Sequence, residues 1–107
     1  MEMPEGDKWT NNEIVRLKAM YDGGALLTQM EDGLHRKATT ILFRLSRVGG
    51  FPSRLEASGR PWSPLDRALL DRMRHGEANV KSVVETLERT PAAMASEVRR
   101  RGWQSGT

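Results

Sequence analysis

The chain has 107 residues, of which 37% are hydrophobic and 29% are charged, so it has room for one ordinary domain or two very small ones with a thin core. It contains no cysteine, which excludes a disulfide framework, a thiolate nucleophile and cysteine-based zinc or iron–sulfur sites. Its net charge of +3 is too small to identify a partner by itself. We therefore expect a small all-α protein that packing alone stabilises.

The first expected helix spans residues 11–22. Thr10 and Glu13 have the spacing of a capping box, in which each side chain satisfies a backbone N–H of the first turn. Gly23 follows as a left-handed cap. Leu17 and Met20 form the inward stripe, and Trp9 is expected to cover the core where the helix begins.

Two shorter helices are expected next, over residues 25–33 and 37–48. The first carries Leu27, Met30 and Leu34 at helical spacing, and the second has a buried stripe of Ile41, Leu45 and Val48. A rotation of about 100° per residue then directs one set of side chains of the third helix away from the core. This outward set comprises Arg36, Thr39, Thr40, Phe43, Ser46 and Arg47.

The same pattern recurs later in the chain. A shift of 53 residues without gaps superposes mostly apolar, Gly and Arg positions, which two copies of one packed unit would retain. Between residues 9–49 and 62–102 the identical pairs are Trp9/Trp62, Leu17/Leu70, Met20/Met73, Gly23/Gly76, Ala25/Ala78, Leu34/Leu87, Arg36/Arg89, Arg47/Arg100 and Gly49/Gly102. We interpret the chain as two homologous modules, 1–50 and 62–107. They are joined by a linker, 51–61, from which Phe51 and Leu55 are candidates to dock on a module.

The helices of the second module are expected over 64–75, 79–87 and from Pro91 to near Gly102. Ser63 and Asp66 form its capping box, Pro64 suits the first helical position, and Gly76 is the expected left-handed cap. The outward set of its third helix comprises Arg89, Ala92, Ala93, Ser96, Arg99 and Arg100. Three short helices with a brief turn before an exposed third helix describe a helix-turn-helix arrangement.

Positive charge gathers around the two third helices. Residues 35–49 hold four bases and no acid, residues 89–103 hold four bases and one acid, and the rest of the chain is net acidic. Cations near a helix C-terminus also suit the helix dipole, which accounts for part of this pattern, Arg99 to Arg101 above all. Arg36, Lys37 and Arg89 lie at helix starts, where an external anion such as phosphate explains them better.

Taken together, these residues resemble the Myb/SANT-like helix-turn-helix repeat, including its short bacterial and phage relatives such as the GcrA-like proteins. The likeness covers residues 9–49 and 62–102. It is carried by Trp9-Thr10, Glu13, Leu17, Met20, Gly23, Leu34, Arg36, Ile41, Arg44-Leu45 and Gly49, and by Trp62-Ser63, Asp66, Leu70, Met73, Gly76, Leu87, Arg89-Thr90, Met94, Val98 and Gly102. The resemblance implies DNA binding, with each third helix in the major groove and the modules following successive parts of one site.

The resemblance also implies an ion pair between Glu13 on the first helix and Arg44 on the third. In the second module the matching positions are both acidic, Asp66 and Glu97, so that pair cannot form there. Glu97 would repel phosphate, and the second module is therefore expected to contact DNA less closely or to face a protein. Only the first tryptophan of the family's aromatic core is present in each module.

The remaining chemistry-bearing residues indicate no enzyme. His35 and His75 stand alone without metal-ligand spacing, no catalytic or phosphate-loop motif is present, and no cofactor, metal or small-molecule substrate is expected. The methionines are expected to fill the core, and Trp103 to make a capping contact rather than a stacking platform. Phe43 could touch a thymine methyl group, bury against the linker near Phe51, or form a dimer contact.

Two functions fit this sequence. The first is a DNA-binding transcriptional regulator that contacts double-stranded DNA through phosphates and guanine edges, with Thr39, Thr40, Phe43 and Ser96 adjusting base preference. Its expected cations are Arg36, Lys37, Arg44, Arg47, Arg89, Arg99, Arg100 and Arg101. The second is a protein-interaction module that binds RNA polymerase, a sigma factor or another protein through an acidic surface. No apolar run suggests a membrane partner and residues 1–5 lack a signal-peptide pattern, so we expect a cytoplasmic protein, nucleoid-associated if it binds DNA.

Overall fold

The computed structural model describes residues 9–51 (the first half) and 61–100 (the second half), and its regular secondary structure there is entirely helical. The first half contains α1 (Asn11–Asp22), α2 (Leu27–Leu34) and α3 (Ala38–Val48). The second half contains α5 (Pro64–Arg74), α6 (Val80–Leu87) and α7 (Pro91–Arg100). The all-α fold class is confirmed for these residues, and the helices lie close to the ranges expected from the sequence.

Two of the helix starts are built as their local sequence predicts. The Thr10 hydroxyl accepts a hydrogen bond from the Glu13 N–H at 3.1 Å, and the Glu13 carboxylate accepts one from the Thr10 N–H at 2.9 Å. Ser63 and Asp66 repeat this reciprocal pair at 3.1 and 3.2 Å, with Pro64 in the first turn. Capping is a contact between near neighbours, so the spacing alone is sufficient to predict it.

The helix ends differ in detail from the expectation. Gly23 caps α1 with a φ of −83°, so it is not left-handed, and the left-handed residue is Gly24 at φ 82°. Gly76 is left-handed as expected, but the cap of α5 is His75. The second helices, α2 and α6, end in left-handed His35 and Glu88, which the sequence analysis did not anticipate because neither is a glycine.

The buried apolar residues form one cluster to which both halves contribute. The expected inward residues Leu17, Ile41 and Leu45 are in it, whereas Val48 and Met20 are only partly buried against it. Trp9 and Trp62 also pack against its edge, as predicted. The expected stripe omitted two buried α3 residues, Ala38 and Leu42, because it assumed that only one face of this helix is covered.

Phe51 docks as one of the two linker candidates, with its ring edge-on to Tyr21 at a centroid distance of 5.6 Å. Gly49 leaves room for this ring, because a Cβ there would collide with a Phe51 ring carbon and lie 2.9 Å from the Leu45 carbonyl oxygen. Leu55, Arg101 and Trp103 lie outside the described residues, so the expectations for them have no structural counterpart.

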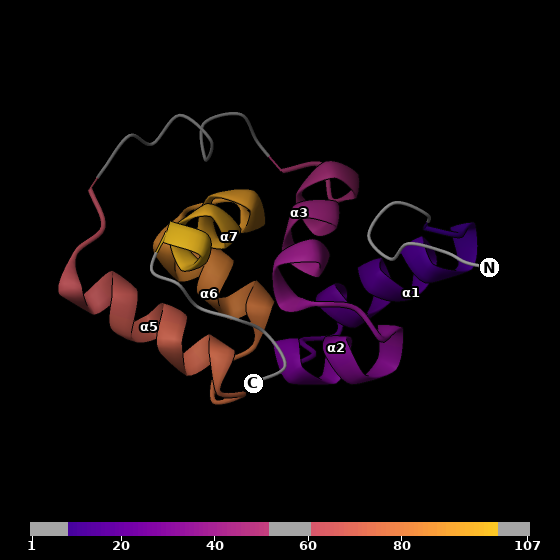
Figure 1. Cartoon of the computed structure of the whole chain (residues 1–107), viewed down its shortest axis with the longest axis horizontal. Coiled ribbons are helices and arrows are strands. Elements are labelled where there is room, and N and C mark those ends of the chain that lie inside the picture. The colour runs from indigo at the N-terminus through magenta and orange to yellow at the C-terminus, as the bar shows by residue number, and fades with distance from the viewer. Residues whose placement is uncertain (1–8, 52–60, 101–107) are drawn as a thin grey trace.

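The two third helices lie side by side, α3 in magenta and α7 in yellow-orange (Figure 1). Their contact is the most extensive between any two helices of the described chain. The Ser46 hydroxyl accepts a hydrogen bond from the backbone N–H of Ala92 at 3.2 Å, which ties the last turn of α3 to the start of α7. Ser46 and Ala92 both belong to the expected outward sets, so these two faces are turned partly toward each other.

Candidate nucleic-acid interface

Arg36 is the first expected DNA contact, and its side chain lies inside the protein. It is only 8% exposed, and its guanidinium donates to both carboxylate oxygens of Glu13 at 3.0 to 3.3 Å. The same guanidinium stacks over the Trp9 ring, 4.3 Å from the ring centroid. Its anion is thus the internal carboxylate of Glu13, and the expected contact of Arg36 with an external phosphate is wrong.

Arg89 occupies the matching place in the second half. Its side chain is 5% exposed, stacks over Trp62 at 4.3 Å, lies 4.0 Å from the Asp66 carboxylate and donates to the Pro61 carbonyl at 3.2 Å. We correct its assignment in the same way as that of Arg36. The two arrangements, Trp9–Glu13–Arg36 and Trp62–Asp66–Arg89, are related by the same shift of 53 residues. We call them the internal arginine clusters.

The carboxylate of Glu13 is stabilised in its charged form. The hydrogen bond from the Thr10 backbone N–H is the largest cause that lowers its pKa, and the Arg36 guanidinium lowers it further. The expected Glu13–Arg44 ion pair is therefore wrong, because Arg36 occupies that place. Arg44 is half-buried, with its guanidinium 5.6 Å from the centroid of Trp9.

Glu97 does not face solvent as the sequence suggested. It is 2% exposed and lies 3.3 Å from Arg67 on α5 and 3.3 Å from Arg100 in the next turn of α7. Its charge is compensated within the protein, so the expected repulsion of phosphate is weakened. The compensation also engages Arg100, whose side chain remains largely exposed.

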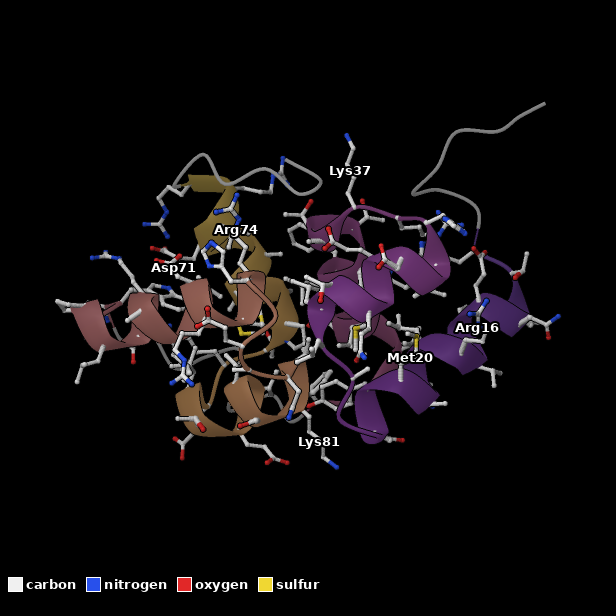
Figure 2. All side chains as sticks on the ribbon, turned by 90° about the horizontal axis from the view of Figure 1, so that it is seen from below. Arg16, Met20, Lys37, Asp71, Arg74 and Lys81 are labelled. Atoms are coloured by element: carbon white, nitrogen blue, oxygen red, sulfur yellow. The ribbon has the colours of Figure 1, made fainter. Side chains whose placement is uncertain are left out.

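Four of the expected DNA-contacting cations have exposed side chains: Lys37, Arg47, Arg99 and Arg100. Lys37 extends away from the helices, just before α3 begins (Figure 2). Ser96 is also exposed, whereas Thr39 and Thr40 are half-buried. The expected set is thus divided into an internal part and an external part.

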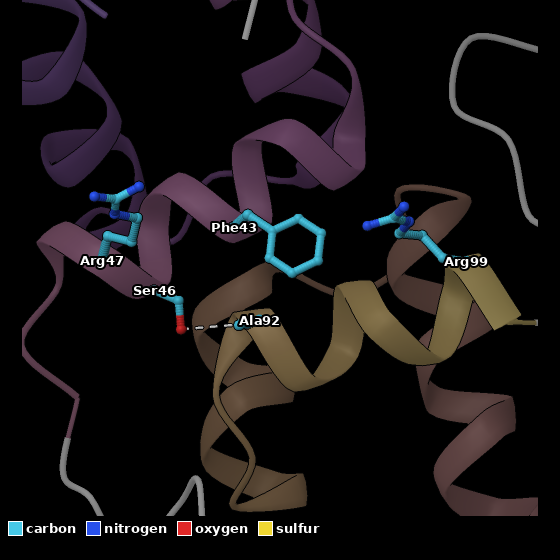
Figure 3. A pocket seen from close by; sticks show the side chains of 5 residues that line it. All are labelled: Phe43, Ser46, Arg47, Ala92 and Arg99. Carbon is cyan, nitrogen blue, oxygen red and sulfur yellow. Dashed lines mark hydrogen bonds between the residues drawn. The ribbon is translucent and has the colours of Figure 1, made fainter. Parts of the chain in front are cut away.

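The external part includes the rim of a shallow groove of about 730 Å³ between α3 and α7, which we call the α3–α7 groove. Its lining residues are Phe43, Ser46, Arg47, Ala92 and Arg99, with the two arginines on opposite helices (Figure 3). Two of these five residues are arginines and none is acidic, so the lining carries positive charge. Its lining residues belong to the outward sets expected from the sequence, but the groove itself exists only because the two helices pack together.

Phe43 lies under Arg99, whose guanidinium is 5.8 Å from the ring centroid. It also packs partly against the core, so it is not a free surface residue. The thymine-methyl and dimer roles weighed from the sequence stay predictions. A cation held over an aromatic face keeps its charge available at the groove while its position is restricted.

Within residues 9–51 and 61–100, acidic and histidine side chains form no group suited to a metal ion, and none of the helices is long and apolar enough to cross a membrane. Comparison of the chain with protein-family models, curated proteins and solved structures produced no match.

Proposed function

We propose that this chain is a DNA-binding protein, a transcriptional regulator of the nucleoid, built from two tandem three-helix modules of the helix-turn-helix type. Its DNA-contact surface is the rim of the α3–α7 groove with the adjoining start of α3. The observation that supports this most is the pair of exposed arginines, Arg47 and Arg99, which flank a groove that no carboxylate lines. Such a positive concave strip is complementary to a phosphate backbone.

The packing of α3 on α7 changes how the two modules meet the duplex. Packed helices lie about 8–10 Å apart, whereas equivalent points of successive major grooves are about 34 Å apart. The two third helices therefore contact one stretch of duplex together, not two successive grooves. The protein is positioned on phosphates by Arg47, Arg99 and Lys37. Ser96 is exposed on α7 and is the candidate for contacting a base edge.

The experiment is a salt series of fluorescence anisotropy with a labelled 30-bp duplex of random sequence. Removing two phosphate contacts lowers the slope of log affinity against log salt by about 2, because each contact contributes about 0.9. We expect this decrease for Arg47→Ala/Arg99→Ala. The matched control, Lys18→Ala/Arg72→Ala, removes two exposed positive charges on α1 and α5 and keeps the wild-type slope. Equal slopes for the two variants would refute the surface assignment.

A second candidate is a protein-interaction module that binds the transcription machinery. The internal location of Arg36 and Arg89 favours it, because fewer cations remain for phosphates than the sequence suggested. In that case the α3–α7 groove meets an acidic protein surface. Purified RNA polymerase, with and without sigma factor, tests it by interferometry: binding to polymerase together with salt-insensitive or undetectable duplex binding would replace the DNA proposal.

A further inference from the structure

An isolated antiparallel bridge joins the two halves at equivalent positions. It pairs Leu26, just before α2, with Asn79, just before α6. These two residues are separated by 53 positions, the same shift that relates the two halves in sequence. An antiparallel pair that joins a residue to its own equivalent is what a two-fold axis between two copies produces.

The contacts between helices follow the same rule. In a two-fold arrangement, if element i of one copy contacts element j of the other, then j of the first contacts i of the second. Helix α1 contacts α6, and the counterpart contact of α2 with α5 is present. The third helices, α3 and α7, are each other's counterparts and contact one another directly.

Charged side chains repeat this reciprocity to within one residue. Burial and the nearby Glu85 carboxylate on α6 raise the pKa of Tyr21 on α1. The residue 53 positions after Tyr21 is Arg74 on α5; burial raises the pKa of Glu31 on α2, and the nearby Arg74 opposes that rise. Glu31 is the chain neighbour of Asp32, the equivalent of Glu85. Ser46 and Arg99 are also separated by 53 positions, and both line the α3–α7 groove, as expected if the axis passes through that groove.

We propose that the two halves are related by an internal two-fold axis, which passes between Leu26 and Asn79 and between α3 and α7, and that duplex DNA binds with one of its own dyads on this axis. The DNA part rests on the proposed function. The two strands of a duplex run in opposite directions and are related by two-fold axes perpendicular to the helix, so a two-fold protein surface matches them. The third helices then contact the duplex in inverted orientation, not as the tandem repeats that the sequence suggested.

The helices α3 and α7 carry different side chains at equivalent positions, although the two-fold axis relates the orientations of the two helices. Phe43 matches Ser96, and Ser46 matches Arg99, whereas Arg47 and Arg100 are the same residue type. The two half-sites therefore differ in base sequence, and the symmetry is found in the position of the contacts along the two strands. A search for a perfect palindrome would miss it.

The axis itself is tested by spin-label distances in the free protein. The chain has no cysteine, so paired cysteine substitutions are labelled uniquely. Two pairs of exposed positions are related by the axis: Val15→Cys with Glu85→Cys, and Asp32→Cys with Ala68→Cys. A two-fold axis makes the two distances equal within the width of the label distribution, and unequal distances overturn the axis whether or not the chain binds DNA.

The DNA part is tested by directed cleavage on a duplex enriched from a pool of 30-bp duplexes with 20 random central positions. Iron-EDTA is attached to His35→Cys or to Glu88→Cys, which are equivalent exposed positions at the ends of α2 and α6 and outside the groove. We expect the two conjugates to cleave at equal distances from one base pair, on opposite strands. Patterns that are displaced along the same strand in the same sense would overturn the inverted orientation.

The failures can be told apart. A pool that the chain does not retain refutes the proposed function, and the spin-label distances still decide the axis. Retention without an enriched sequence leaves DNA binding in place but overturns the two half-sites of different base sequence, because such half-sites would fix one register. Equal distances together with mirrored cleavage support both parts.

Discussion

Arg36 provides the sharpest contrast between a structural and a DNA-contacting arginine. Replacing it with alanine removes the charged hydrogen bonds to Glu13 and the stacking on Trp9. A net hydrogen bond to a charged group contributes about 1.5–3 kcal/mol, and a partly desolvated cation over an aromatic ring about 1–2 kcal/mol. The Glu13 carboxylate keeps its Thr10 partner and is 25% exposed, so it is rehydrated in part.

We therefore expect Arg36→Ala to lower the free energy of unfolding by about 2–3 kcal/mol, less than the 3–5 kcal/mol lost when a fully buried ion pair is broken. Arg36→Lys keeps the charge but loses the planar fork, so it recovers only part of the stability. Arg47→Ala, on the exposed rim, changes the unfolding free energy by less than about 0.5 kcal/mol.

Urea unfolding monitored by tryptophan fluorescence and circular dichroism measures these differences, with the duplex affinity of each variant measured at a temperature where it is folded. If Arg36 is internal and Arg47 contacts DNA, Arg36→Ala loses stability and Arg47→Ala loses duplex affinity. A stable Arg36→Ala variant with the binding defect of Arg47→Ala would show that Arg36 contacts DNA, and would refute the internal assignment.

Three further results follow from the structure. The fold lowers the pKa of Glu13, so the ionised carboxylate stabilises the protein above its ordinary pKa near 4.5, and this stabilisation is lost as the pH falls through the lowered pKa. Between pH 7 and pH 3, the free energy of unfolding in urea should therefore fall less for Glu13→Gln than for wild type. Burial, with Glu85 and Asp22 nearby, raises the pKa of Tyr21 to about 12, so stability is complete below pH 10 and falls as the pH rises toward 12. Tyr21 is the single tyrosine, and absorbance at 295 nm should show its midpoint near pH 12 when folded and near 10 in urea; a folded midpoint near 10 would contradict its burial. Leu42→Ala should cost about 2–5 kcal/mol in urea unfolding, since Leu42 is fully buried, and a loss below about 1 kcal/mol would show that its side of α3 is open.

Features that depend on near neighbours could be predicted from the sequence. The capping boxes at Thr10 and Ser63 are contacts across three residues, and the helix ranges follow from local periodicity. The left-handed caps at His35 and Glu88 were missed because neither residue is a glycine, the usual residue at that position.

The internal arginines and the groove depend on contacts between distant residues. A cation at a helix start is ordinarily assigned to the surface, and its partner Glu13 lies 23 positions away. One signal was present: Arg36 and Arg89 coincide under the shift of 53 together with a tryptophan and an acid, as a packed cluster would. The α3–α7 groove had no such signal, because no local pattern states which outward faces meet.

The central claim is that α3 and α7 stay packed together while they contact DNA. Ser46→Cys/Ala92→Cys places two cysteines at the hydrogen-bonded crossing of these helices, in a chain with no other cysteine, so oxidation can lock the crossing with one disulfide. Duplex affinity and its salt slope are measured by anisotropy for the oxidised and reduced forms, with bond formation verified by mass spectrometry. We predict the same affinity and slope in both forms. Binding that disappears on oxidation and returns on reduction would contradict the claim, because it would show that the helices must separate to reach DNA.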